Sequence, residues 1–331
     1  MDIQTTSESL EGSQKRMTLL QTLNQGSRWL TVTGFLMMAD IVISIIGLIT
    51  DSTLVTGAPA WLKPLKFGLS TCLFSFTVAF FIGCLSKTRL TAVVGRVLAI
   101  MLTLEIVIID VQATRHIPSH FNKSTGLDTA LYGVMGMGIS VVLVCTLVLF
   151  AVSWWERFAD RSLALAIRLS LGLALAGMLT GFLMTLPTPQ QLADARAGRP
   201  MPAVGAHTIG ASDGGPGLPL TGWSADHGDL RIAHFTGLHA MQLLILGWWL
   251  VARHKASWCE TRRSRLVCVI AAVIGGVFVI ELWQALRGLP LLRPDAAISA
   301  SWGICLLAAV GLSVWVCLPA LQAMQPARRV R

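Results

Sequence analysis

Residues 127–154 have the sequence LDTALYGVMGMGISVVLVCTLVLFAVSW, and this stretch decides the fold class. Its one charged residue is Asp128, near its start. A helix needs about 20 apolar residues to cross the hydrocarbon core of a bilayer. Seven further apolar runs have comparable character: 29–50, 65–85, 90–111, 163–186, 233–253, 266–286 and 296–318. Because backbone polar groups in lipid must be satisfied within the segment, continuous runs of this kind predict helices.

The overall composition also indicates lipid as the solvent. Of the 331 residues, 54% are hydrophobic and 13% are charged, and the mean hydropathy is +0.67. A soluble domain usually carries about a quarter charged residues. We therefore predict an all-α, polytopic integral membrane bundle of about eight transmembrane helices in residues 29–318. A polar cytoplasmic segment (1–28) precedes this domain, and a basic cytoplasmic tail (319–331) follows it.

The distribution of lysine and arginine predicts the orientation. Eight spans put both termini on one side, and 17 of the 26 basic residues lie in the termini and loops of that side. The other nine are Lys63, Lys66, Arg115, Lys123, Arg196, Arg199, Arg231, Arg287 and Arg293. Short cytoplasmic loops carry the excess of basic residues, so both termini are expected to be cytoplasmic. The net charge of +9 then reflects topology and does not indicate nucleic-acid binding.

Cysteine placement agrees with this topology, and composition favours a bacterial inner (plasma) membrane. None of the seven cysteines falls in a predicted extracytoplasmic loop, so no structural disulfide is expected there. The chain is rich in Ala, Leu, Val and Arg and lacks organelle-targeting features. The lipid bilayer is therefore the expected partner, a lipid or small molecule is the expected ligand, and protein partners stay open.

The longest predicted loop, 187–232, lies on the extracytoplasmic side between the fifth and sixth spans. It is rich in glycine and proline, yet it also holds His207, Asp213 and Trp223. Long loops in compact proteins tend to be functional or disordered, and a disordered linker would rarely carry clustered aromatic and His/Asp residues. We expect this loop to fold over the helix ends as a lid.

Three acids lie inside predicted spans: Asp40, Glu105 and Glu281. A carboxylate at the bilayer centre costs roughly 2.5–3.5 kcal/mol on insertion scales, so such residues should face the bundle interior and mark a functional site. The alternative is a structural role, in which each acid pairs with a nearby basic or polar group and fixes helix packing.

Polar residues also recur at helical spacing near the outer ends of the spans. Residues at i, i+3, i+4 and i+7 share one face of a helix. The resulting stripes are Glu105, Gln112 and His116 in the third span, Arg231, Phe235, His239 and Gln242 in the sixth, and Glu281 with Gln284 in the seventh. His234 and His239 lie about 140° apart on the helical wheel and do not share a face. Stripes at one depth predict one polar site.

Residue chemistry suggests roles within this predicted site. The candidate catalytic residues are Glu105, Glu281 and His239, and Asp40 is an intramembrane acid. The candidate substrate-binding residues are Lys66, Gln112, Arg115, Arg231, Gln242, Gln284 and Arg287. Neutral imidazoles bind transition metals, so the candidate metal ligands are His116, His120, His234 and His239, although no HExxH signature is present.

Three functions fit these residues. The first is a metal-assisted enzyme acting on a lipid or lipid-linked substrate, in which a divalent metal generates a nucleophilic water. The second is a redox protein that binds haem b through histidines, with a quinone nearby. The third is a proton-coupled transporter with Asp40, Glu105 and Glu281 as a relay. The reaction and the substrate stay open at this point.

Overall fold

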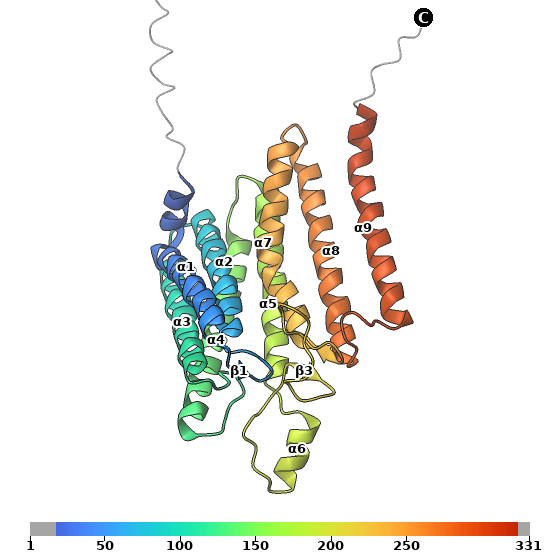
Figure 1. Cartoon of the computed structure of the whole chain (residues 1–331). Coiled ribbons are helices and arrows are strands. Elements are labelled where there is room, and N and C mark those ends of the chain that lie inside the picture. Colours follow the sequence, from blue (N-terminus) through green and yellow to red (C-terminus); the bar gives the residue numbers. More distant parts are fainter. Residues whose placement is uncertain (1–17, 324–331) are drawn as a thin grey trace, which may run out of the picture.

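The computed structural model describes residues 18–323, and within them eight long helices form a bundle (Figure 1). They are α1 (Leu19–Thr50), α2 (Leu62–Cys84), α3 (Arg89–Thr114), α4 (Gly126–Trp155), α5 (Arg161–Met184), α7 (Leu230–His254), α8 (Glu260–Leu286) and α9 (Ala296–Ala323). Each is long and apolar enough to cross a membrane. The prediction of an all-helical, multi-pass fold is confirmed. The outer parts of the predicted terminal segments, 1–17 and 324–331, lie outside the described residues.

Side-chain caps explain why several helices start before the apolar runs do. Thr18, Thr88 and Thr125 each accept a hydrogen bond from the backbone N–H three residues later, at the starts of α1, α3 and α4. Asp160 and Asp229 cap α5 and α7 by accepting from the backbone N–H two residues later, and Asp160 also from the one after it. Such caps satisfy backbone donors that have no partner inside the helix. The helices therefore extend into the polar sequence that flanks each apolar run.

The long helices pack in two groups. Helices α1 to α4 pack on one another, and α5, α7 and α8 form the second group, as Figure 1 shows. The groups meet where α4 contacts α5 and where α2 contacts α7. One apolar core joins them and includes Val78, Leu98, Leu149 and Leu171. Helix α9 packs chiefly on α8 and stands at the edge of the bundle.

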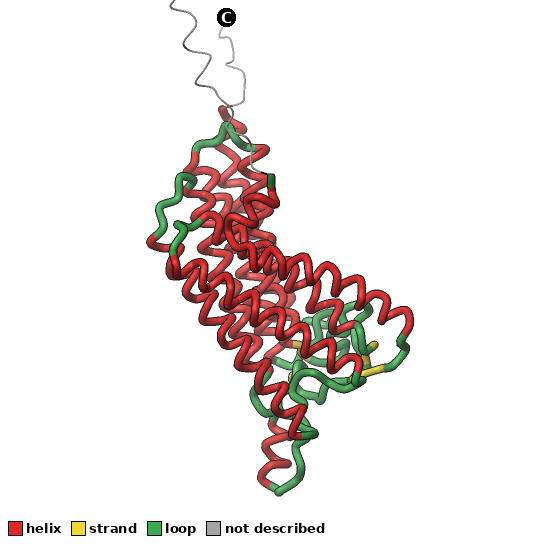
Figure 2. The backbone as a smooth tube through the Cα atoms, turned by 90° about the vertical axis from the view of Figure 1, so that its left-hand side faces the viewer, coloured by secondary structure: helices red, strands yellow, loops and turns green. Residues whose placement is uncertain are grey.

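The connections between helices are unevenly divided between the two ends of the bundle. We call the end where α1 finishes and α2 begins the loop end, and the opposite end, where α1 begins and α9 finishes, the terminal end. The loop end carries β1 (Leu54–Val55) paired with β2 (Ala58–Pro59), and the long α5–α7 connection. That connection contains α6 (Pro189–Arg196) and β3 (Thr208–Ile209), which pairs with β4 (Gly228–Asp229). Figure 2 shows most of the irregular segments gathered at this end.

The α5–α7 connection is tied to the helix ends by backbone hydrogen bonds. Val204 N donates to Phe121 O, and Ala206 N donates to Met184 O, both at 2.9 Å. These bonds satisfy backbone groups that would otherwise lack partners next to an apolar bundle. The connection is therefore ordered structure against the loop end, and its role as a lid stays a prediction.

Candidate functional site

A group of ionisable side chains meets at the loop end. We call it the loop-end site, and it consists of Lys63, Lys66, Glu105, His120, His207, Asp213 and Arg231. His120 Nε2 lies 3.4 Å from Glu105 Oε1, and His120 Nδ1 lies 3.1 Å from Ser119 Oγ. Lys63 is close enough to Glu105, Asp213 and Arg231 to interact with each electrostatically. The site thus draws on α2, α3, α7 and two connections.

The turn between α3 and α4 directs His120 into the bundle. His116 and Phe121 have φ angles of 56° and 62°, a left-handed conformation that residues other than glycine seldom adopt. The His120 ring packs against Phe67 and Tyr132, with centroids 5.5 and 6.4 Å away. Burial, reinforced by the positive charge of a nearby lysine, lowers the pKa of His120. A neutral imidazole therefore faces Glu105.

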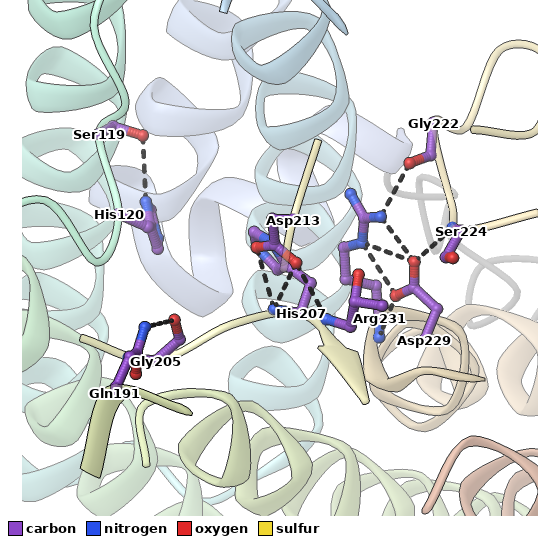
Figure 3. A network of polar contacts seen from close by, with 11 residues as sticks. Ser119, His120, Gln191, Gly205, His207, Asp213, Gly222, Ser224, Asp229 and Arg231 are labelled. Carbon is purple, nitrogen blue, oxygen red and sulfur yellow. Dashed lines mark hydrogen bonds and ion pairs between the residues drawn. The ribbon is translucent and has the colours of Figure 1, made fainter. Parts of the chain in front are cut away.

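His207 and Asp213 form a close pair within the α5–α7 connection, labelled in Figure 3. His207 Nδ1 lies 2.6 Å from Asp213 Oδ2. Burial lowers the pKa of His207 to about 4, although Asp213 opposes the shift. Burial by itself raises the pKa of Asp213, but hydrogen bonds from His207 and Thr208 outweigh it and hold that pKa well below its usual range. The pair joins an ionised carboxylate to a neutral imidazole at neutral pH.

Arg231 and Asp229 form a second pair at the start of α7. Arg231 Nη2 lies 2.6 Å from Asp229 Oδ2 and also donates to Gly222 O at 2.8 Å. Asp229 additionally accepts from Ser224 N at 2.7 Å and caps the helix. In Figure 3 the His207–Asp213 pair lies between His120 on one side and this pair on the other. Arg231 therefore has a carboxylate partner already.

The two lysines at the start of α2 form no ion pair with a carboxylate among residues 18–323. Lys66 Nζ donates to the carbonyl oxygen of Thr221, 2.7 Å away, which carries no formal charge. Lys63 Nζ lies 5.7 Å from the centroid of the Phe67 ring and has no hydrogen bond to a described residue. Both lysine side chains are half-buried. Both feel the charge of Arg231 and of carboxylates that lie beyond ion-pair distance. Burying an ammonium group without an anion is costly.

Deeper in the bundle, His239 and His234 face different helices. His239 Nε2 lies 3.0 Å from Ser70 Oγ of α2, and its Nδ1 lies 3.3 Å from Gln242 Oε1. His234 Nδ1 lies 2.7 Å from Gly177 O of α5. Phe235 stacks on His239 with a centroid distance of 5.8 Å. These imidazoles link α7 to its neighbours, one on each side.

Three of the predicted residues lie together at the α3–α4 turn instead. Arg115 Nη1 is 2.9 Å from Asp128 Oδ1, and Gln112 Nε2 donates to the same oxygen at 3.1 Å. His116 Nε2 lies 2.9 Å from Asp51 Oδ2. Hydrogen bonds from Thr53, with a further contribution from His116, hold the pKa of Asp51 well below its usual range. These contacts fasten the α3–α4 turn to the ends of α1 and α4.

A separate group of polar residues lies near the end of α8, beside α7 and the start of α9: Glu281, Gln284 and Arg287. Glu281 contacts Thr236 of α7, and one of its carboxyl oxygens has no hydrogen-bond partner among the described residues. Gln284 Nε2 donates to Pro290 O at 2.7 Å. Arg287 Nη2 pairs with Asp295 Oδ2 at 2.6 Å. A small pocket borders Glu281 and Gln284 on this side of α7.

The histidines that were predicted as metal ligands contact separate partners. The part of the chain that the structure describes holds no group of three or more His, Cys, Asp or Glu placed to share a metal ion. His116 contacts Asp51 and His120 contacts Glu105. In the loop-end site each histidine pairs with one acid, His120 with Glu105 and His207 with Asp213, beside three basic side chains.

Comparisons with protein-family models, with characterised proteins and with solved structures found no match to this chain. Its function is therefore inferred from the geometry of the site.

Helical spacing had not indicated Ser119, Lys63 or the His207–Asp213 pair as site residues. Ser119 and His207 lie in connections, where no periodicity applies. Lys63 precedes Lys66 by three positions, a spacing that puts both on one helix face. That signal was present, but it also fits two lysines that reach outward to headgroups.

Proposed function

We propose that the loop-end site binds the anionic head of a lipid or of a lipid-linked substrate. One observation carries this proposal: Lys63 and Lys66 begin a membrane-spanning helix side by side, and neither forms an ion pair with a carboxylate of the described residues. A phosphate or carboxylate between them would offset the cost of burying their charges, since charge-assisted hydrogen bonds are the strong ones. Arg231, already paired with Asp229, adds positive potential beside them.

The level of the site in the bundle favours a lipid as the source of that anion. Both lysines lie in the first turns of α2, where the chain enters the apolar zone. Trp61 directly precedes this helix, and Trp223 packs near Phe235 of α7. Tryptophans and lysines at helix ends are typical of the headgroup region. We further propose that this end faces the extracytoplasmic side of a bacterial inner membrane, because basic residues are in excess at the opposite end.

Lipid titration of the purified protein tests the binding proposal. Phosphatidylglycerol, added to protein in a zwitterionic detergent, should change the tryptophan fluorescence at lower concentration than phosphatidylcholine does. A hydrogen bond to a charged group contributes about 1.5–3 kcal/mol, so Lys63→Gln or Lys66→Gln should weaken phosphatidylglycerol binding roughly tenfold or more. Lys123→Gln is the matched control, since Lys123 is exposed at the same end. Equal binding of both lipids, unaffected by the variants, would contradict the proposal.

A second function, hydrolysis or group transfer on the bound molecule, is favoured by one chain of contacts. Ser119, His120 and Glu105 stand in the order nucleophile, base and carboxylate, with spacings of 3.1 and 3.4 Å. Such triads are recognised by geometry and not by sequence order. In this mechanism His120 takes the proton of Ser119 as Oγ attacks the ester, and then gives that proton to the leaving group. His120 then takes a proton from water, the water attacks the ester on Ser119, and His120 returns the proton to Ser119 Oγ as the product leaves.

A fluorophosphonate probe tests this second function separately. The probe should label the protein in membranes through Ser119, and Ser119→Ala should abolish the labelling. His120→Gln should reduce it strongly, because the hydroxyl loses its base. Ser124→Ala, at an exposed serine of the same connection, is the control. Labelling that survives Ser119→Ala would exclude this function and leave the lipid titration unaffected.

A further inference from the structure

Apart from the loop-end site, two carboxyl groups meet inside the membrane-spanning part of the bundle. Helices α1 and α3 run parallel, both from the terminal end to the loop end (Figure 1). Thr33 Oγ1 and Thr103 Oγ1 lie 3.4 Å apart across their contact. Asp40 and Asp110 each follow about two helical turns later, so the same register brings them to one level. The two carboxyl groups are close enough to influence each other's ionisation.

The surroundings of Asp40 are built to hold its carboxyl group. Asp40 is 6% exposed. Its carboxyl fits against α2 where Gly68 has no side chain, since a Cβ at position 68 would lie 2.5 Å from Asp40 Oδ2. Ser44, one turn further along α1, is fully buried, and its hydroxyl has no hydrogen-bond partner among the described residues. Asp40 and Ser44 therefore face the neighbouring helices and not the lipid.

No described residue donates a hydrogen bond to this pair. Both oxygens of Asp40 and Oδ1 of Asp110 are buried and without a donor in residues 18–323. Among the charged groups near the loop-end half of α2 and α3, Lys66 donates to the α5–α7 connection and Glu105 faces His120. Lys63 lies beside the Phe67 ring. Helix α1 itself has no other charged residue between Arg28 and its end.

We propose that Asp40 and Asp110 form a proton-binding site, in which one proton is shared between the two carboxyl groups and exchanges reversibly. Two adjacent carboxylates in a low-dielectric interior cannot both be ionised. A shared proton converts their repulsion into a short, charge-assisted O–H···O⁻ hydrogen bond, and the pair then titrates as a unit. No third His, Cys, Asp or Glu of the described residues joins the pair to make a metal-binding group.

This pair differs from the relay of Asp40, Glu105 and Glu281 that the sequence suggested. The structure brings Asp40 to Asp110, whereas Glu105 contacts His120 and Glu281 lies beside α7. The proton site is also independent of anion binding at the loop end, because it shares no residue with it. A protonatable pair between α1, α2 and α3 would let proton uptake change the packing of these helices.

Labelling with N,N′-dicyclohexylcarbodiimide, an apolar reagent that adds to protonated carboxyl groups, tests the proposal on the full purified chain. Peptide mass spectrometry should find the adduct on Asp40 or Asp110 in mildly acidic buffer. The yield should fall about tenfold for each pH unit above the midpoint of the pair. Asp110→Asn removes the like charge and supplies an amide donor, so Asp40 should ionise and lose its adduct at neutral pH. Asp40→Asn should do the same to Asp110.

Specific outcomes overturn the proposal. If Asp40 is still labelled in Asp110→Asn, burial alone keeps it protonated and no proton is shared. If sodium chloride protects the pair and choline chloride does not, a small metal cation is the ligand. Asp51 is the control within the same digest, since its hydrogen-bonded carboxylate should stay unlabelled. Should the variants not fold, the wild-type infrared spectrum must still show a protonated carboxyl band, and its absence overturns the proposal.

Discussion

Single residues at the loop end differ in charge because burial and hydrogen bonding act on them in different proportions. His207 has one strong partner, and burial outweighs it. Asp213 receives hydrogen bonds from two backbone N–H groups as well as from the imidazole, and these outweigh burial. The His207–Asp213 pair thus fastens the α5–α7 connection, and the strength of this fastening depends on the protonation state of His207.

The docking of this connection is expected to weaken as the pH falls. Burial lowers the pKa of His207 from 6.5 to about 4 in the folded protein. Between these values the undocked or unfolded chain binds a proton that the folded chain does not, so stability is lost as pH falls through this window. Limited proteolysis across residues 187–229 should accelerate there, and His207→Gln should remove the pH dependence.

Another histidine of the same connection is the control. His227 is exposed, so His227→Gln should leave the pH dependence of proteolysis as it is in the wild type. A proteolysis rate that does not change with pH in the wild type would show that His207 does not fasten the connection.

Among the helices, the crossing of α5 and α7 positions the histidines of α7. Gly177 and Gly237 face each other, and a Cβ on Gly237 would lie 2.5 Å from the Cα of Gly177. Small residues let membrane helices approach closely. That approach allows His234 to reach the carbonyl oxygen of Gly177.

Gly237→Ala should therefore destabilise the protein. Its methyl group would have to push α5 and α7 apart, and overpacking of this kind costs about 1–3 kcal/mol. Gly136→Ala in α4 is the matched control, because nothing lies within 4 Å of its added Cβ. Replacing a helical glycine by alanine is favourable by about 0.5–1 kcal/mol in the absence of clashes. In thermal unfolding in detergent, Gly237→Ala should lower the midpoint temperature relative to the wild type, and Gly136→Ala should raise it.

For the whole molecule, the wide exposed apolar surface is explained by a bilayer that covers it. Helix α9 shows this best, with Ile304, Leu306 and Leu307 each more than half exposed. At the terminal end, two hydrogen bonds also join it to α8: Arg262 donates to Val316 O and Cys317 O. Such a helix is stable at the edge of the bundle when lipid covers its outer face.

Cysteine labelling in intact bacterial cells tests the orientation. A membrane-impermeant maleimide should label a cysteine introduced by Ser212→Cys, in the exposed α5–α7 connection, without permeabilisation. Native Cys259 is exposed at the terminal end and should react only after permeabilisation. Cys259→Ser identifies its signal. The reverse pattern would place the loop end in the cytoplasm.

The amino-acid sequence by itself determined the number and type of the spanning elements. Each apolar run satisfies its own backbone hydrogen bonds as a helix, and it spans the membrane if it is as long as the hydrocarbon core is thick. Both conditions depend on that run alone. The cap at Asp229 was predictable for the same reason, because a carboxylate that precedes an apolar run favours a helix start there.

Tertiary structure alone decided which polar residues meet. Periodicity fixes the face of one helix, but the register between helices and the path of a connection depend on packing over the whole bundle. Glu105 and His116 share a stripe on the sequence, yet the turn after α3 sends His116 to Asp51 and brings His120 to Glu105 instead. Likewise, only the parallel register of α1 and α3 joins Asp40 to Asp110, since contacts between distant segments leave no periodic signal in either one.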